Sequence, residues 1–343
     1  MSDDLPRPDP PIRRIVTTHD EHGKATVMSL GPATNHKWSG SGTVSTLIWS
    51  SDEAPAEIWT DEDFGARIIA TQPPEHGCRF CVIDFPAGTP GRMHRTDTVD
   101  CVVCLHGEID MDMDEDMDGT HSVHMKAGDV MVQQGTNHAW TNRGTDTCRI
   151  AFVLIDAKPS GAKDSDGSLA GPGPIATVAA PPPDGIAAPE PEIRRIVTTH
   201  DGAGTALVMN DGKPPGFRGS GRGNVSSLIW STDETPAEIW SAEDFGARTL
   251  GTQPPPRGSR FCIIDYPPGT PGRMHRTETV DLIVCLAGGI DMEMDDGLIV
   301  HLYPGDVMVQ QGTNHSWINN GTTTCRLALA LLDAKPQDSK QKA

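Results

Sequence analysis

The hydrophobic and polar positions of this chain follow one pattern twice. The segment IRRIVTTHD occurs at 12–20 and again at 193–201, and in both copies apolar and polar side chains alternate. Alternation with a period of two predicts a β-strand with one buried face. The runs VSTLIW at 44–49 and VSSLIW at 225–230 are β-branched and apolar, and they predict a second strand in each copy.

The two copies continue in the same way. An acidic segment around a Trp and a Phe follows, which we interpret as a short helix or an irregular clasp over a barrel. Each copy then contains a strand that ends in a Pro/Gly turn, followed by several further short strands. Because no long stretch has helical periodicity, the pattern predicts an all-β fold, a sandwich or a barrel in each copy.

The duplication determines the number of domains better than the length of 343 residues does. We predict two β-barrel domains, at 12–157 and 193–335. The segment between them, 158–192, is rich in Gly, Pro and Ala and has too few apolar side chains to fold, so we predict a disordered, flexible linker. The two ends, 1–11 and 336–343, are predicted to be disordered tails.

The charge balance narrows the range of partners. There are 28 Lys and Arg against 47 Asp and Glu, a net charge of −19. Such a protein repels phosphate backbones and anionic lipids, so we expect no nucleic-acid or membrane partner. No apolar run approaches the roughly 18 residues of a membrane span. The acidic, Pro-rich start lacks the basic and apolar parts of a secretory signal, and we expect a cytoplasmic protein.

Two Cys-x2-Cys pairs, at 78–81 and 101–104, have the spacing of a four-thiolate zinc site. The second copy replaces two of the four thiols with Ser259 and Leu282. Residues three apart on a strand also point to opposite faces. We therefore interpret the cysteines as buried thiols of a protein in a reducing compartment.

Histidine-containing motifs are the most similar parts of the two copies. GTPGRMHRTDTVDCVVCLHG at 88–107 recurs as GTPGRMHRTETVDLIVCLAG at 269–288. GDVMVQQGTNHAWTN at 128–142 recurs as GDVMVQQGTNHSWIN at 305–319. The spacings G-x5-H-x-T-x3-D-x6-G and G-D-x4-Q-G-x2-H-x3-N resemble the two motifs of the cupin superfamily. With both motifs present twice, the chain is similar to tandem two-domain proteins of that family, the bicupins.

This resemblance implies two tandem cupin-type β-jelly-roll barrels, packed as an intramolecular pseudo-dimer that can assemble further. It also implies a divalent transition metal inside the barrel, held by two histidines and an acid of the first motif and a histidine of the second. Thr96 and Thr277 replace one of those histidines here, and aspartate replaces glutamate. The remaining candidate metal ligands are His94, Asp100, His138, His275, Asp281 and His315. Two imidazoles and a carboxylate favour Fe(II), with Mn, Ni or Zn as alternatives.

Other residues beside the motifs are candidates for substrate contacts. Arg92 and Arg273 flank the first histidine and can hold a substrate carboxylate in bidentate fashion. The alternative is that they are surface arginines pairing with the acids of the protein. Glutamines precede the second histidine, and one of each neighbouring pair should point inward because strand neighbours alternate. These candidate catalytic residues, which would orient substrate, are Gln133, Gln134, Gln310 and Gln311.

Two further pairs of histidines recur. We interpret His19 and His200, each followed by an aspartate at the end of a strand, as turn caps. His124 and His301 lie within predicted strands and are candidate acid-base groups if they face into the barrel.

Taken together, these residues favour a metal-dependent cupin enzyme that acts on a small organic molecule, with a preference for non-haem iron dioxygenase-type chemistry. That preference depends on the two histidines and one carboxylate of each copy. The alternatives are a cupin decarboxylase, isomerase or lyase, or a non-catalytic bicupin that binds a small molecule. No Ser-His-Asp or Cys-His nucleophile and no Gly-rich phosphate loop stands out in the sequence.

Overall fold

The computed structural model describes residues 7–114, 122–159 and 189–337. Most of the predicted linker and parts of both predicted tails lie outside the described residues. In the described part, helical structure is limited to three 3-10 turns, and none of them could cross a membrane. The turns are η1 (Phe64–Ala66), η2 (Phe245–Ala247) and η3 (Asp295–Gly297).

All other regular elements are strands, which confirms the predicted all-β fold. The strands of the first repeat are β1 (Arg13–His19), β2 (Ala25–Pro32), β3 (His36–Trp38), β4 (Val44–Ser51), β5 (Cys78–Phe85), β6 (Thr98–His106), β7 (Glu108–Met113), β8 (Ser122–Lys126), β9 (Val130–Gln134), β10 (His138–Thr141) and β11 (Cys148–Asp156). Those of the second repeat are β12 (Arg195–His200), β13 (Ala206–Gly212), β14 (Phe217–Gly219), β15 (Val225–Thr232), β16 (Ser259–Tyr266), β17 (Thr279–Ala287), β18 (Ile290–Met294), β19 (Ile299–Leu302), β20 (Val307–Gln311), β21 (His315–Ile318) and β22 (Cys325–Asp333).

These strands form two barrels, each made of an eight-stranded and a three-stranded sheet. The first barrel combines the sheet β13-β12-β9-β6-β11-β5-β4-β3 with the sheet β10-β7-β8. The second barrel combines β14-β15-β16-β22-β17-β20-β1-β2 with β19-β18-β21. Side chains from both sheets of a barrel belong to one buried apolar cluster, as expected for a jelly roll.

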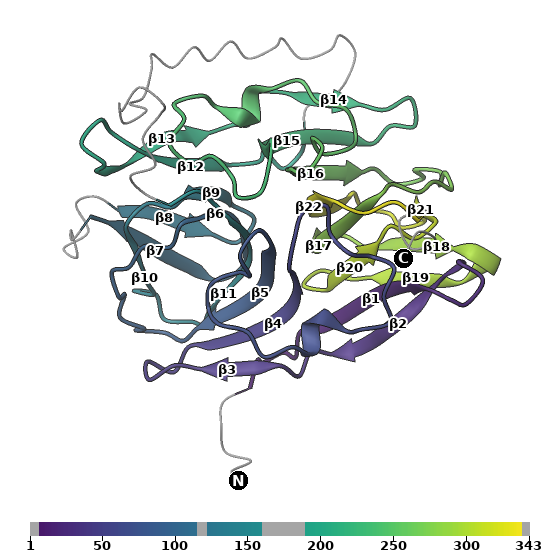
Figure 1. The fold of residues 1–343 in the computed structure, drawn as a ribbon, viewed down its shortest axis with the longest axis horizontal. Helices are drawn as coiled ribbons and strands as arrows, with labels where there is room; N and C mark the ends of the chain where they lie inside the picture. The colour runs from purple at the N-terminus through teal and green to yellow at the C-terminus, as the bar shows by residue number, and fades with distance from the viewer. Residues whose placement is uncertain (1–6, 115–121, 160–188, 338–343) are drawn as a thin grey trace.

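The opening hairpin of each repeat belongs to the barrel of the other repeat. β1 pairs in parallel with β20, and β12 pairs in parallel with β9. Figure 1 shows β1 and β2, in purple, beside the yellow-green β20, and β12 and β13 beside β9. The predicted domain ranges treat each repeat as one barrel, whereas each eight-stranded sheet contains strands of both repeats.

The exchange is also visible in the apolar cores. The interior of the first barrel includes Ile196 and Ala206 of the second repeat. The interior of the second barrel includes Ile15 and Ala25 of the first repeat. A third cluster contains side chains of both repeats, among them Val103 of β6. Strands such as β6 are therefore buried on both faces, because one face lines a barrel and the other contributes to this shared cluster.

The cysteines follow the same division. All eight are buried and free. Cys78 and Cys101 belong to the shared cluster, whereas Cys81 and Cys104 belong to the interior of the first barrel. The four thiols of the zinc-like spacing thus point to opposite faces, as strand geometry predicts. Burial also raises the pKa of Cys78 to about 11, so this thiol stays protonated.

Candidate functional site

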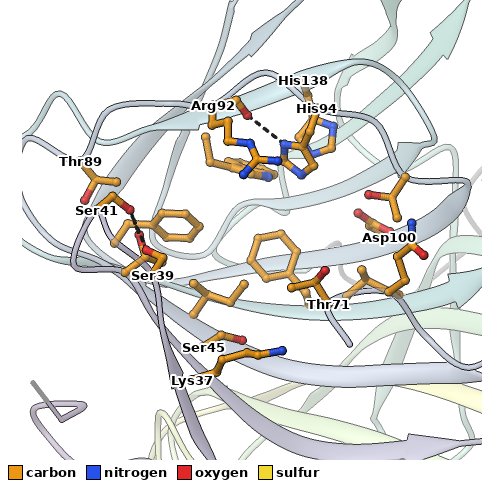
Figure 2. Close-up of a pocket in the computed structure, with 18 of the residues that line it drawn as sticks. Lys37, Ser39, Ser41, Ser45, Thr71, Thr89, Arg92, His94, Asp100 and His138 are labelled. Carbon is orange, nitrogen blue, oxygen red and sulfur yellow. Dashed lines mark hydrogen bonds between the residues drawn. The ribbon is translucent and has the colours of Figure 1, made fainter. Parts of the chain in front are cut away.

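A cavity of about 640 Å³ opens in the first barrel. Four of the residues predicted from the motifs line it: Arg92, His94, Asp100 and His138. Figure 2 shows the two histidines and Arg92 together on one part of the wall, with Asp100 on another part. The volume is in the range of pockets that enclose a small organic molecule.

His94 and His138 come together because their backbones pair. His94 lies just before β6 and His138 begins β10, and each backbone N–H donates to the carbonyl of the other at 2.9 Å. The ring centroids are 4.5 Å apart. His94 Nδ1 lies 2.9 Å from the Arg92 carbonyl, and His138 Nδ1 lies 2.8 Å from the Thr136 carbonyl. Since a carbonyl oxygen only accepts, each Nδ1 carries the hydrogen and each Nε2 keeps its lone pair.

The electrostatics of His138 agree with this tautomer. The side chain is 2% exposed, and burial, together with the nearby His94, lowers the pKa of His138 to about 4. The imidazole is therefore neutral at physiological pH. A neutral imidazole whose Nδ1–H is held by a carbonyl is the form in which histidine usually binds a metal.

Asp100 is not gathered with the two histidines. It is the third residue of β6, whereas His94 precedes that strand, so the strand carries the carboxylate away from the imidazoles. Across the described ranges, no three His, Cys, Asp or Glu side chains are grouped to hold a metal ion. The two imidazoles fit a divalent metal as ligands, but the triad predicted from spacing is not assembled.

The environment of Asp100 favours the protonated carboxyl instead. The residue is 5% exposed, and burial raises the pKa of Asp100 to about 7, against the opposing charge of Arg79. In the described part of the chain, its Oδ1 atom has no hydrogen-bond partner. Near neutral pH this carboxyl can therefore be present in both its protonated and its ionised form.

Neither glutamine of β9 is among the residues that line the cavity. Gln133 lies opposite Asp100, which does line it, so Gln133 is on the inward face of the sheet, and its contact with substrate stays a prediction. Both side chains are fully buried. Gln133 Nε2 donates to Thr136 O at 2.8 Å, and Gln134 Nε2 donates to Thr198 O of β12 at 2.8 Å. Because β9 lies between β6 and the exchanged strand β12, the polar groups at its end bind neighbouring backbone atoms.

Cationic side chains outnumber acidic ones around the cavity. Arg92 lines it as predicted and is exposed. Lys37, Arg79 and Arg95 also line it, and Asp100 is its only acidic residue among those described. Lys37 and Arg79 were not predicted as cavity residues from the sequence. A signal for Arg79 was present, because it is a charged residue within the otherwise largely apolar strand CRFCVIDF.

The rest of the wall is largely apolar. It includes the aromatic side chains of Trp38, Phe85, Trp140 and Phe152. Trp140 packs with its ring edge towards Phe152, at 5.5 Å between centroids, and its ring also faces His138. We interpret these rings as the surface that contacts the body of a ligand.

The second barrel repeats the histidine pair. The ring centroids of His275 and His315 are 4.4 Å apart. Their Nδ1 atoms lie 2.9 Å from the carbonyls of Arg273 and Thr313. Burial lowers the pKa of His315 to about 4 and raises the pKa of Asp281 to about 7. The second site therefore has the same kinds of polar groups as the first.

Gln310 and Gln311 also behave like their counterparts in the first barrel. Both are fully buried, and their amide nitrogens donate to Thr313 and to Thr17 of β1. The apolar walls of the two barrels differ. Repeat alignment places Gly219 at the position of Trp38 and Leu329 at that of Phe152. The two barrels therefore differ in the side chains available to a ligand.

The other recurring histidines lie outside the cavity. Asp20 and Asp201, not the histidines, accept the backbone N–H groups of the turns after β1 and β12. The ring of His19 instead stacks on Trp59, and that of His200 on Trp240. Nδ1 of His124 contacts Asp110, and Nδ1 of His301 contacts Asp291, so neither faces into a barrel.

Comparison with known proteins identifies sequence relatives of the chain. No family model matches the chain. Phomopsin biosynthesis cluster protein C' of Diaporthe leptostromiformis is 36% identical over 157 residues, which cover 43% of this chain and 82% of the relative. The cupin-domain-containing oxidoreductase fogC of Aspergillus ruber is 33% identical over 40% of this chain and 71% of its own length. Oryzines biosynthesis cluster protein J of Aspergillus oryzae is 32% identical, over 45% of this chain and 89% of the relative. Each match spans about one repeat.

Among solved structures, a cupin 2 conserved barrel domain protein from Leptotrichia buccalis is 9% identical, with a TM-score of 0.43 over 87% of this chain and 91% of that chain. A salicylate 1,2-dioxygenase variant from Pseudoaminobacter salicylatoxidans is 12% identical, with a TM-score of 0.44 over 74% of this chain and 70% of that chain.

A jelly-roll barrel with a pair of histidines on its inner wall defines a cupin-type protein. The sequence relatives make the assignment specific, because their identity exceeds 30% over more than two thirds of their own length. The chain belongs to the family of cupin-domain-containing proteins.

Proposed function

We propose that this protein is a cupin oxidoreductase that converts a small organic molecule in the cavity of the first barrel, with an equivalent site in the second. The observation that carries this proposal is the pair of imidazoles whose Nδ1 atoms contact backbone carbonyls and whose Nε2 atoms keep their lone pairs. Relatives named as cupin-domain-containing oxidoreductases support the reaction class.

His94 and His138 would hold a divalent metal in the first barrel, as would His275 and His315 in the second. Fe(II) is favoured, since imidazole ligands with several open positions suit O2 chemistry, and Mn, Ni or Zn are the alternatives. The metal would supply Lewis acidity and, in the case of iron, a redox-active centre at which O2 could react with the substrate, which would be the net electron donor. The carbonyls of Arg92 and Thr136 hold the two rings in the tautomer that this role needs.

Residues around the cavity support a substrate with an anionic group and an apolar body. Arg92 and Lys37 bring positive charge to the wall, in a protein whose net charge is −19. A guanidinium group can hold a carboxylate through two hydrogen bonds. The rings of Phe85 and Trp140 would contact the apolar part of such a molecule.

Asp100 would move the proton that such a reaction requires. Burial raises the pKa of Asp100 to about 7, so near neutral pH this carboxyl can both release and accept a proton. Its Oδ1 atom has no hydrogen-bond partner in the described ranges, and the residue lines the cavity. We therefore assign it the role of general acid or base toward the bound substrate.

Metal analysis tests the proposal. Wild-type protein, reconstituted anaerobically with Fe(II) and freed of unbound metal, should retain two equivalents by mass spectrometry. His94→Ala and His275→Ala should each lose one equivalent, and the double variant should lose both. The two barrels thus serve as matched controls for each other. Wild-type protein that retains no metal, or a double variant that retains all of it, would overturn the metal-dependent mechanism.

A metal-free binding barrel is the second candidate. One observation favours it, namely that the described residues provide no third acidic, thiol or imidazole ligand beside the histidine pair. In that case an aromatic carboxylate probe such as benzoate should bind with the same affinity in the presence and absence of a chelator. A chelator that weakens binding of benzoate would favour the oxidoreductase instead.

A further inference from the structure

The loop that carries the second histidine of the first barrel is held by the second repeat. Thr198, on the exchanged strand β12, accepts the backbone N–H of Gln134 on its hydroxyl at 3.2 Å and the Gln134 side-chain amide on its carbonyl at 2.8 Å. The Thr198 hydroxyl also lies 3.1 Å from the hydroxyl of Thr136. All three residues are completely buried, so water does not compete for these contacts.

From Thr136 the hydrogen bonds continue to His138. The Gln133 amide nitrogen lies 2.8 Å from the Thr136 carbonyl and 2.9 Å from the Thr136 hydroxyl. These two acceptors use both hydrogens of the amide group. None is left for Nδ1 of His138, which is 3.1 Å away. Nδ1 must therefore carry its own hydrogen, which it donates to the Thr136 carbonyl at 2.8 Å.

We propose that Thr198 is a positioning residue of the first-barrel site, contributed by the second repeat. The Thr198 hydroxyl holds the Thr136 hydroxyl in the position in which the Thr136 hydroxyl accepts a hydrogen bond from the Gln133 amide. That contact occupies the amide and so fixes His138 as the Nδ1–H tautomer, with the Nε2 lone pair available to a ligand. The inference deepens the proposed function, because the tautomer matters to a metal or substrate bound at Nε2.

The same arrangement occurs in the opposite direction. Thr17 of β1, in the first repeat, accepts the Gln311 N–H at 3.2 Å, and its hydroxyl lies 3.0 Å from that of Thr313. The Gln310 amide nitrogen is 2.7 Å from the Thr313 carbonyl and 2.9 Å from its hydroxyl. Each repeat therefore completes the histidine site of the other repeat.

Thr198 is not the only contact between the second repeat and this loop. His200 Nε2 lies 3.2 Å from the carbonyl of Gly135. Gly135 has a φ of 55°, and a Cβ there would come within 2.6 Å of Ile239 Cδ1. The loop thus has a left-handed residue packed directly against the second repeat, which suits glycine. The exchanged hairpin and the clasp after it confine the loop on more than one side.

The tautomer of His138 can be read directly by NMR. Full-length, metal-free protein with 15N-labelled histidine gives long-range 1H–15N spectra that separate the Nδ1–H and Nε2–H forms. Thr198→Val keeps the shape of the side chain and removes the hydroxyl. We expect it to change the tautomer ratio of His138 about threefold to tenfold towards Nε2–H, the range for one lost hydrogen bond. Fe(II) bound at this site should weaken by a similar factor.

Two control variants make the test specific. Thr198→Ser keeps the hydroxyl and should restore the wild-type tautomer ratio. Thr17→Val should change the tautomer ratio of His315 and leave that of His138 unchanged. If Thr198→Val fails to fold, Thr136→Val removes the next hydroxyl in this series of hydrogen bonds. That variant must shift the tautomer ratio of His138 in the same direction.

A His138 that stays in the Nδ1–H form in folded Thr198→Val, or a change of equal size at both histidines, would overturn the inference. The spectra are recorded without metal. Wild-type protein that binds no metal would therefore contradict the proposed function and leave this result interpretable.

Discussion

Asp100 lies directly opposite Gln133 in the antiparallel pair of β6 and β9. Both side chains are buried, and across the described residues neither Asp100 Oδ1 nor Gln133 Oε1 has a hydrogen-bond partner. Asp281 and Gln310 have the same relationship in the second barrel. Burial disfavours the charged carboxylate, and one of its oxygens has no partner, whereas a protonated carboxyl gains a hydrogen to donate. This accounts for the raised pKa of Asp100, about 7, and of Asp281.

We therefore predict that Asp100→Asn stabilises the protein above pH 7. The pKa of Asp100 is about 7 in the folded protein against 3.8 as its ordinary value, so between these pH values the folded state binds more protons than the unfolded state. Stability then falls as the pH rises from about 4 to 7 and is constant above it. The neutral amide avoids this loss, which is on the order of 1 to 4 kcal/mol.

Urea unfolding of the variant and the wild type at pH 5 and pH 8 measures the difference. The difference in free energy of unfolding between Asp100→Asn and the wild type should be larger at pH 8 than at pH 5. Asp281→Asn should show the same pH dependence. An equal gap at both pH values would show that Asp100 does not titrate in this range.

A second prediction concerns the charge of the cavity. Arg92→Gln should weaken binding of benzoate, an anionic aromatic probe, about tenfold or more, because hydrogen bonds to charged groups contribute roughly 1.5 to 3 kcal/mol. Neutral benzamide should bind the variant and the wild type alike. NMR titration that follows the indole signal of Trp140, a residue of the cavity wall, gives both affinities. Arg273→Gln, the equivalent change in the second barrel, should leave the Trp140 titration unchanged.

The strands and the histidine pair could be predicted from sequence because both depend on local pattern. Alternation marks the strands, and the cupin-like spacings mark His94 and His138. The exchange of hairpins could not be predicted. The same segment, RRIVTTH, contains the first strand of each repeat. Its two possible partners, β9 and β20, both have the sequence VMVQQ. Pairing within a repeat and pairing between repeats therefore bury the same side chains in the same register, and no local signal separates them.

The position of Asp100 failed to follow from spacing for a related reason. Sequence separation gives the location of a residue along a strand, but not its distance from a histidine in the segment before that strand. The hydrogen bonds of Gln133 and Gln134 depend on the exchange of hairpins and so could not be predicted either. Once β12 lies beside β9, Thr198 binds Gln134, and the loop from 135 to 138 closes over Gln133.

A third prediction uses a buried ion pair that occurs twice with different exposure. Arg195 and Asp244 pair with side-chain exposures of 0% and 3%, whereas Arg14 and Asp63 pair with exposures of 8% and 31%. Both aspartates also cap a 3-10 turn, through Gly246 and Gly65. Removing one partner of a fully buried pair leaves an uncompensated charge, at a cost of about 3 to 5 kcal/mol.

Asp244→Ala should therefore destabilise the protein by that amount, and Asp63→Ala by clearly less. Because the capping bonds are the same, the difference isolates the burial of the charge. Chemical denaturation of both variants at neutral pH provides the comparison. Equal losses would indicate that the cap, not the ion pair, sets the effect.

The exchange of hairpins leads to a fourth prediction, in which a deletion at the start of the chain damages the distant barrel. Removing residues 1–33 deletes β1 and β2, which pair with β20 and contribute Ile15 and Ala25 to the core of the second barrel. The first barrel keeps every strand of its sheets. Hydrogen exchange should therefore accelerate in β20, which loses its neighbour, while β9 stays protected by β12.

Metal binding should likewise be lost at the histidine site of the second barrel. Without Thr17, which contacts Thr313 and Gln311, the loop before His315 loses its support, so metal binding should fall from two equivalents to one. His94→Ala in the truncated protein should remove the remaining equivalent. If exchange instead accelerated in β9 and the first site were lost, the hairpin would belong to its own repeat, contrary to the observed pairing. Because the two barrels are nearly identical in sequence around their sites, this comparison reports topology and not the strength of either site.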